Sequence, residues 1–317
     1  MRLRRALMAA LAVALPPAAQ GQHVVTVRAD NDAFNFWQLP WRRPDEEYTS
    51  GVRLTVEFPG TAAWARRLGL ARDGCRGDTV PCATHTYAFG QDIFTAVRPR
   101  NVPTARPGGR PDAGVLWISS TNRRERTSHL TEFGWTLGIT GKPSLAETMQ
   151  RLFHDMAPSL NRPITWSAQI PAEPVFAVRL DRRQLARAGA LEVQPHAGAS
   201  LGSLLTEVRA GMGVRLGPHL AHPWMNVAGG RLQAALVGDA TVRAVARNEV
   251  LNGALFRSGP HVTTRPIVTE LQAGVRLRWH MLEASWLAHQ TGAEYVPRTL
   301  PHTWSTLEAS WFPTRRR

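Results

Sequence analysis

Apolar and polar side chains alternate strictly along several parts of this chain. Between residues 52 and 58, apolar residues alternate with arginine, threonine and glutamate, and the same period recurs in 133–139, 208–216 and 271–279. A period of two places successive side chains on opposite faces of an extended backbone, so each of these segments is predicted to be a β-strand with one apolar face.

Twelve such segments span the chain, and the fold class they predict is all-β. The polar face carries arginine and glycine, as the wet lumen of a barrel does, so we expect a transmembrane antiparallel β-barrel rather than a sandwich. Six tryptophans near strand ends suggest an aromatic girdle: Trp117, Trp166, Trp279, Trp286, Trp304 and Trp311. The predicted strands are 23–32, 48–58, 84–94, 113–121, 129–139, 164–180, 190–200, 206–217, 231–246, 265–279, 281–294 and 302–312.

The first 21 residues are predicted to be a secretory signal peptide. Arginines at positions 2, 4 and 5 precede an apolar run from Ala6 to Leu15, and small residues follow before Gln22. An uncleaved anchor is the alternative. The run is shorter than the ~20 residues of a spanning helix. Residues 22–317 contain no apolar run of that length. If the mature protein enters a membrane, it must therefore do so as a closed barrel.

Composition narrows the choice of partners. The formal charge is +14 and the pI is about 11.4. An exported protein rarely meets nucleic acid, so we expect anionic lipid or lipopolysaccharide as the partner, with a role in solubility alone as the alternative. Cys75 and Cys82 are expected to form a disulfide in a periplasmic turn, because exported proteins fold in an oxidising compartment.

With both termini periplasmic, the longer connections lie at the extracellular end, and one candidate site is the top of the first two strands. Asp30, Asn31 and Asp32 end the first strand, and Thr49 opens the second. Carboxylate, amide and hydroxyl oxygens are the hard ligands that Ca²⁺ prefers, although a capped turn would use the same residues. Strand parity puts Asn31 and Asp32 on opposite faces, so both serve one site only at the barrel lip.

A short helix is predicted inside the extracellular connection 140–163. Ser144 and Glu147 have the spacing of a capping box, and Gln150 and His154 then lie four residues apart on one helical face. His154 is the candidate general base, and Gln150 would orient a water or a substrate carbonyl. The alternative is that His154 is an ordinary surface histidine.

Residues 198–202 match the G-x-S-x-G pattern of a serine nucleophile elbow, with Ser200 at its centre. That pattern requires a strand-to-helix turn in an α/β sheet. Here it ends an alternating strand beside a tight turn, so we interpret its glycines as turn residues.

Six short motifs in order resemble one family over the whole chain, from the signal to the last strand. The chain is similar to the outer-membrane lipid A 3′-O-deacylases. The motifs are residues 30–34 (Asp-Asn-Asp-Ala-Phe), 48–51 (Tyr-Thr-Ser-Gly), 90–95 (Gly-Gln-Asp-Ile-Phe-Thr), 110–114 (Arg-Pro-Asp-Ala-Gly), Gln150 with His154, and 166–169 followed by Glu173-Pro174.

The resemblance implies a twelve-stranded barrel with a calcium-dependent site facing the outer leaflet. Such enzymes hydrolyse the ester that holds the 3′-linked acyloxyacyl chain of lipid A. Asn31, Asp32 and Thr49 match the calcium and substrate end of that site, with Asn31 also catalytic, while Gln150 and His154 match the catalytic helix. His154 would then deprotonate water, and calcium would polarise the ester carbonyl.

Two departures from the family pattern concern the connection 95–112. Gly109 to Asp112 stand where the family has an acid-arginine-proline-aromatic run, and the loop lacks the family's lysine, since Lys142 is the only lysine of the chain. Arg98 and Arg100 are the candidates to replace it as phosphate contacts. A phospholipase-like serine hydrolase using Ser200 and a barrel without catalysis are the remaining alternatives.

Overall fold

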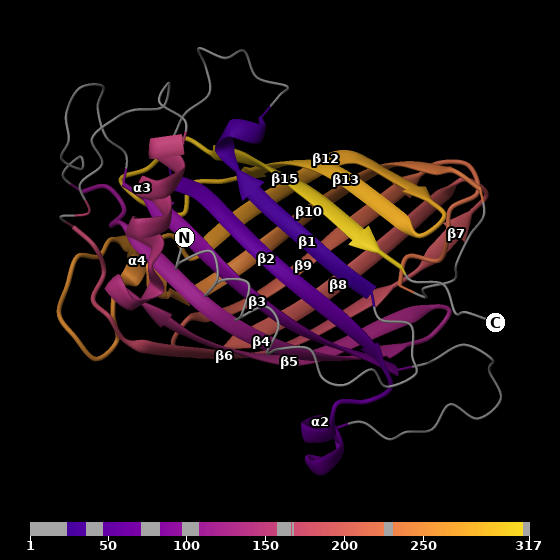
Figure 1. Cartoon of the computed structure of the whole chain (residues 1–317), viewed down its shortest axis with the longest axis horizontal. Coiled ribbons are helices and arrows are strands. Elements are labelled where there is room, and N and C mark those ends of the chain that lie inside the picture. Colours follow the sequence, from indigo (N-terminus) through magenta and orange to yellow (C-terminus); the bar gives the residue numbers. More distant parts are fainter. Residues whose placement is uncertain are drawn as a thin grey trace.

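The computed structural model describes residues 24–35, 47–70, 83–96, 108–156, 166, 168–224 and 231–312, except for the side chains of His154 and Met156. Twelve long antiparallel strands close into a barrel, with first strand paired to last and β6 paired to β8 (Figure 1). They are β1 (Val24–Asn31), β2 (Glu47–Pro59), β3 (Ala83–Thr95), β4 (Ala113–Glu125), β5 (His129–Thr140), β6 (Pro174–Gln184), β8 (Leu191–Leu201), β9 (Leu205–Leu216), β10 (Gln233–Asn248), β12 (Ile267–Trp279), β13 (Leu282–Thr291) and β15 (His302–Trp311).

The shorter elements lie at the two ends of the barrel. Figure 1 shows α3 and α4 at one end of the barrel, which we call the extracellular end following the expected topology. The opposite end, where β2 ends and α2 follows it, is the periplasmic end. Within the described residues, no helix has the length and apolarity to cross a membrane. The short elements are η1 (Asp32–Phe34), α2 (Ala63–Arg67), β7 (Ala186–Ala188), η3 (Lys142–Ser144), α3 (Ala146–Met156), α4 (Glu249–Asn252), β11 (Thr263–Thr264) and β14 (Tyr295–Val296).

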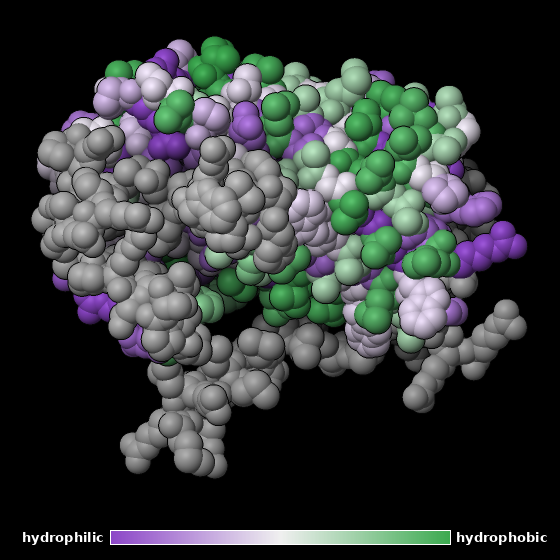
Figure 2. Space-filling view, turned by 90° about the horizontal axis from the view of Figure 1, so that it is seen from above, coloured by the Kyte–Doolittle hydropathy of each residue, from purple (hydrophilic) through white to green (hydrophobic). Residues whose placement is uncertain are grey.

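The outer face of the barrel is apolar, as the alternation predicted. Phe89, Ile118, Leu137 and Phe176 lie in one row across β3 to β6, and each is about half exposed. Figure 2 shows such side chains spread over the outside of the strands. A belt of this kind is stable only in lipid, so it confirms the transmembrane class of the barrel.

The lumen is polar and charged, again as predicted. A cavity of about 880 Å³ runs through it, lined mainly by polar and charged side chains. Its ion pairs cross strands: Arg243 binds Glu207 at 2.7 Å, and Arg123 contacts Glu57. These inward charges thus meet opposite charges, which offsets the cost of removing them from bulk water.

Two predictions about these strands need correction. The sixth strand begins at Pro174 rather than at residue 164, because residues 168–173 form a loop bonded to Asp112. The aromatic girdle holds for Trp279 and Trp311, which are exposed at the periplasmic end, but is wrong for Trp117 and Trp304, which line the lumen. Alternate residues of a strand point to opposite sides of the barrel wall, so the position of a tryptophan in this alternation decides whether it faces lipid or lumen, and its distance from the strand end does not.

Several expectations fall on segments outside the described residues. These are the signal peptide at 1–21, the disulfide between Cys75 and Cys82, and the phosphate contacts Arg98 and Arg100. They stay predictions.

Candidate active site

The first strand ends where the candidate site begins. The Asn31 side chain accepts a hydrogen bond from the backbone N–H of Ala33 at 2.7 Å and so caps η1. The capped turn considered as an alternative therefore exists. The strand ends at Asn31, and the next residue, Asp32, opens η1 and is buried.

A bulge in β2 places Thr49 beside this turn. The register between β2 and β3 shifts from Tyr48 to Ser50, and Ser50 pairs with Asn31 across to β1. Bulges re-aim a side chain, and the Thr49 hydroxyl lies 2.6 Å from the hydroxyl of Thr95. The structure thus places Asn31 and Thr49 near the ends of adjacent strands, and Asp32 follows Asn31 in η1 at the same end of the barrel.

A buried hydrogen-bond network supports this lip from below. The Tyr48 hydroxyl lies 2.9 Å from Asp30 Oδ2 and 3.0 Å from Asp92 Oδ1. The indole of Trp117 donates to Asp92 at 2.7 Å. Sequence reasoning singled out the motifs but missed this network, since its members become neighbours only through register.

Gly51 explains why the motif at 48–51 ends in glycine. A Cβ at that position would overlap the Tyr48 hydroxyl. The Tyr48 side chain therefore lies across Gly51, and this close approach lets its hydroxyl reach both aspartates.

The helix predicted in the extracellular connection is present, but it begins differently. α3 starts at Ala146 after a 3₁₀ turn, and the Ser144 hydroxyl donates to the Gly141 carbonyl at 2.6 Å. Glu147 pairs with Arg151 at 2.6 Å, one helical turn along. The capping box between Ser144 and Glu147 was therefore a wrong prediction, because both side chains bind other partners.

Close packing fixes α3 onto β3 and β4. A Cβ at Gly114 would overlap Ala146, so the helix start rests directly on the β4 backbone. Ile93, Ala146 and Trp166 form a small apolar cluster beneath the helix. These contacts explain the glycine of the 110–114 motif and the tryptophan of the 166–169 motif.

Gln150 faces this cluster. Its side chain is 4% exposed, and its amide oxygen accepts a hydrogen bond from the Trp166 indole at 2.7 Å. His154 follows one turn later on α3, and its side chain lies outside the described residues. The bond of Gln150 to Trp166 anchors the helix, and the contact with water or substrate predicted for Gln150 stays a prediction.

Residues 109–112, where the chain departs from the family pattern, contain one partner of a buried ion pair. Arg110 donates to Glu47 at 3.0 Å, and both side chains are fully buried. Tyr295 also donates to Glu47, at 2.8 Å. Next to this pair, Asp112 accepts a hydrogen bond from the backbone N–H of Ala96 at 3.0 Å. These contacts tie three extracellular connections together.

Outside the barrel strands, Tyr295 titrates unusually. Burial and the adjacent Glu47 carboxylate raise the pKa of its phenol. Tyr295 therefore stays protonated and keeps its hydrogen bond to Glu47.

Ser200 lies in strand β8, at a position facing the lumen. Its hydroxyl lies 3.3 Å from the guanidinium of Arg209, and its backbone pairs with Glu207. The nearby His196 binds Asp239 at 3.0 Å. A regular strand lacks the sharp turn of a nucleophile elbow. The interpretation of the glycines as turn residues holds for Gly202, but it is wrong for Gly198, which lies inside β8 where a Cβ would overlap the Asp181 carboxylate.

The lip offers oxygen donors of the kind that calcium prefers: the Asp32 carboxylate, the Asn31 amide and the Thr49 hydroxyl. The Asn31 oxygen has two lone pairs, and the bond to Ala33 uses one of them. In the part of the chain that the structure describes, no three His, Cys, Asp or Glu side chains gather as metal ligands. The donor set fits calcium in kind, and main-chain carbonyls and water would have to complete the coordination.

A closed barrel with an apolar belt, a charged lumen and a polar cluster at one lip defines an outer-membrane β-barrel protein. A family model described as "Outer membrane protein LpxR" matches residues 6–312, and the chain belongs to this family. This confirms the resemblance inferred from the motifs, and the protein is located in the outer membrane.

Solved structures agree on the fold. The chain is similar to LpxR from Salmonella typhimurium, with a TM-score of 0.72 at 15% identity, covering 92% of this chain and 100% of that one. It resembles the beta domain of the Bordetella autotransporter BrkA less, with a TM-score of 0.46 at 10% identity, covering 93% and 99%. No curated protein sequence matches the chain.

Proposed function

We propose that this protein hydrolyses the ester that holds the 3′-linked acyloxyacyl chain of lipid A in the outer leaflet. The observation that carries the proposal is the placement of α3. The helix is fixed over β3 and β4 at the same barrel end as the cluster of Asn31, Asp32 and Thr49. Family membership over residues 6–312 supports a lipid A substrate.

His154 is the proposed general base. A histidine titrates near neutral pH, so it can accept a proton from water as that water attacks the ester carbonyl. Gln150 acts as a positioning residue: its bond to Trp166 holds the phase of α3 and thereby the direction of the face on which His154 lies.

Asn31, Asp32 and Thr49 are the proposed calcium ligands. When bound, calcium would polarise the ester carbonyl and stabilise the negative charge that develops on its oxygen. Asn31 would also contribute to catalysis as a calcium ligand. Its amide oxygen is held in place because the same side chain caps η1.

Arg98 and Arg100 are proposed to bind the phosphates of lipid A, together with the hydroxyl of Thr49. Arginine keeps its charge and offers a planar pair of donors that matches two phosphate oxygens. The arginine pair would thus replace the lysine that the family has in this loop.

The test is the mass spectrum of lipid A from cells with and without the protein. The expected result is a loss of mass equal to the 3′-linked acyloxyacyl chain. The same loss should occur with refolded protein on purified lipid A, and His154→Ala should lack it. Unchanged lipid A in both assays would favour a barrel without catalysis.

A further inference from the structure

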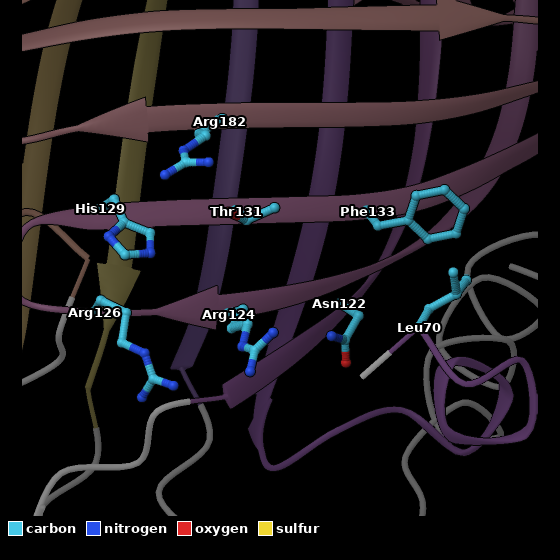
Figure 3. Close-up of a pocket in the computed structure, with 8 residues that line it drawn as sticks. All are labelled: Leu70, Asn122, Arg124, Arg126, His129, Thr131, Phe133 and Arg182. Atoms are coloured by element: carbon cyan, nitrogen blue, oxygen red, sulfur yellow. The ribbon is translucent and has the colours of Figure 1, made fainter. Parts of the chain in front are cut away.

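A basic groove of about 410 Å³ lies on the outer surface of the barrel at the periplasmic end. Figure 3 shows its basic side chains gathered together and two apolar ones at the other side. The basic residues are Arg124, Arg126, His129 and Arg182, and the apolar ones are Leu70 and Phe133. Among the described residues, no carboxylate lines the groove.

Strand register places this groove directly below the apolar belt. Arg124, Thr131 and Arg182 pair in one row across β4, β5 and β6. The next outward-facing row toward the membrane centre contains Phe133 and the exposed Leu180. The arginines therefore lie at the depth where lipid headgroups meet the hydrocarbon region.

The carboxylates closest in sequence face the lumen instead. Glu132 binds Arg123 at 3.2 Å, and Asp181 contacts Arg209. Glu125, which lies between Arg124 and Arg126, is buried and accepts a hydrogen bond from Thr84 at 2.8 Å. Because these acids are paired inside the barrel, they do not neutralise Arg124 and Arg182 outside it. The groove thus keeps a concentration of positive charge at a lipid-facing surface.

The walls of the groove are fixed before any ligand arrives. On one side, Ala62 donates to the Asn122 side chain at 3.1 Å and the Trp64 indole donates to Ser120 at 2.9 Å, which pins α2 to the outside of β4. On the other side, the Trp224 indole donates to the Arg126 carbonyl at 2.8 Å. Preorganised walls lower the ordering cost of binding.

We propose that this groove binds the phosphate of an anionic glycerophospholipid in the periplasmic leaflet. Arg124 and Arg182 would hold the phosphate oxygens by charge-assisted hydrogen bonds, and Leu70 and Phe133 would contact the adjoining acyl chain. The mixed lining favours a lipid, because a soluble phosphate compound has no acyl chain to contact the apolar wall. The site is independent of the proposed lipid A hydrolysis at the opposite end.

The test is native mass spectrometry of the full-length protein in detergent with equal amounts of phosphatidylglycerol and phosphatidylcholine. The wild-type protein should retain phosphatidylglycerol in preference. The double variant Arg124→Gln/Arg182→Gln should bind phosphatidylglycerol roughly tenfold or more weakly, since two charges near the headgroup are lost. Near-ultraviolet circular dichroism would verify that each variant is folded.

The matched control is Arg67→Gln/Arg231→Gln, which removes two exposed arginines at the same barrel end, neither of which lines the groove. It should keep the wild-type preference. If it loses as much as the groove variant, the preference is a general charge effect and the site is refuted. If inorganic phosphate at equal concentration displaces the lipid fully, the groove is a phosphate site and the lipid assignment is wrong.

Discussion

The amide oxygen of Gln150 accepts a hydrogen bond of 2.7 Å from the indole nitrogen of Trp166, beneath α3. Gln150 lies within α3 and Trp166 within the connection between α3 and β6, and both are buried. Their bond therefore joins the helix to the loop that leads into the sixth strand.

The first prediction is that Gln150 and Trp166 act as one unit. Gln150→Ala leaves a buried indole N–H unpaired, at a cost of about 1–3 kcal/mol, and should lower kcat with little change in KM. Trp166→Phe should do the same. The double variant should lose no more than either single variant, as expected for a direct contact. Additive losses in deacylation kinetics would show that Gln150 contacts the substrate instead.

The second prediction concerns His154. General-base assistance contributes typically about 10²–10⁴ in rate, so His154→Ala should lose that range while the barrel still folds. The measurement is release of the acyloxyacyl chain from purified lipid A. Ser200→Ala is the control and should change little, because Ser200 lies in a regular strand. An inactive serine variant beside an active histidine variant would establish a serine hydrolase.

The third prediction is that hydrolysis requires calcium. A chelator should abolish activity and added calcium should restore it, because Asp32 supplies the one carboxylate among the proposed ligands at the lip. Calcium should also raise the melting temperature of the wild-type protein, since a ligand stabilises the state it binds. Asp32→Asn should reduce that shift. Full activity in chelator, with no melting shift, would remove the metal from the mechanism.

The fourth prediction concerns the cysteines. Cys75 and Cys82 should form a disulfide without any part in catalysis, because the predicted topology places them in a periplasmic turn, far along the chain from the site residues. Replacing both by serine should leave the specific activity of folded protein near wild type. A large loss would place this turn at the active site and overturn the predicted topology.

The strands were predictable because their signal is local. Lipid outside and water inside demand alternating side chains, so the alternation itself indicated the outward faces of Leu137 and Val208 without knowledge of any neighbour. The start of β6 was not predictable in this way. The loop before it is held by Asp112, which is distant in sequence, and the segment 164–173 itself carries no mark of that contact.

The site was only partly predictable for the same reason. Asn31, Thr49 and Gln150 were predicted because they belong to short motifs that resemble those of one family. The ion pair of Glu47 with Arg110 joins segments that approach each other only after the barrel closes. The backbone of Glu47 has a positive φ of 74°, which is a local feature of this ion pair, but the sequence does not reveal it.

The last prediction concerns two carboxyl groups in the extracellular connections, Glu249 in α4 and Glu173 before β6. Burial, and then hydrogen bonding to Glu173, raise the pKa of Glu249 to about 7 from an ordinary value of 4.5. Burial opposes ionisation of Glu173 too, but the backbone N–H groups of Leu255 and Phe256 donate to it and lower its pKa. Glu249 thus holds the proton that the pair shares.

Because the pKa of Glu249 is raised on folding, its stabilising contribution is complete below pH 4.5 and is lost as the pH rises through about 7. Glu173 acts in the opposite direction, but only below its ordinary pKa of 4.5, so it does not contribute between pH 5.5 and 8.5. Amide hydrogen exchange in residues 249–256, corrected for the intrinsic effect of pH, should therefore be faster at pH 8.5 than at pH 5.5. Glu249→Gln keeps a hydrogen-bond donor toward Glu173 and should abolish this difference. Glu147→Gln, which removes a carboxylate bound to Arg151 on α3, should retain it; a pH difference that survives in Glu249→Gln would show that another group controls this connection.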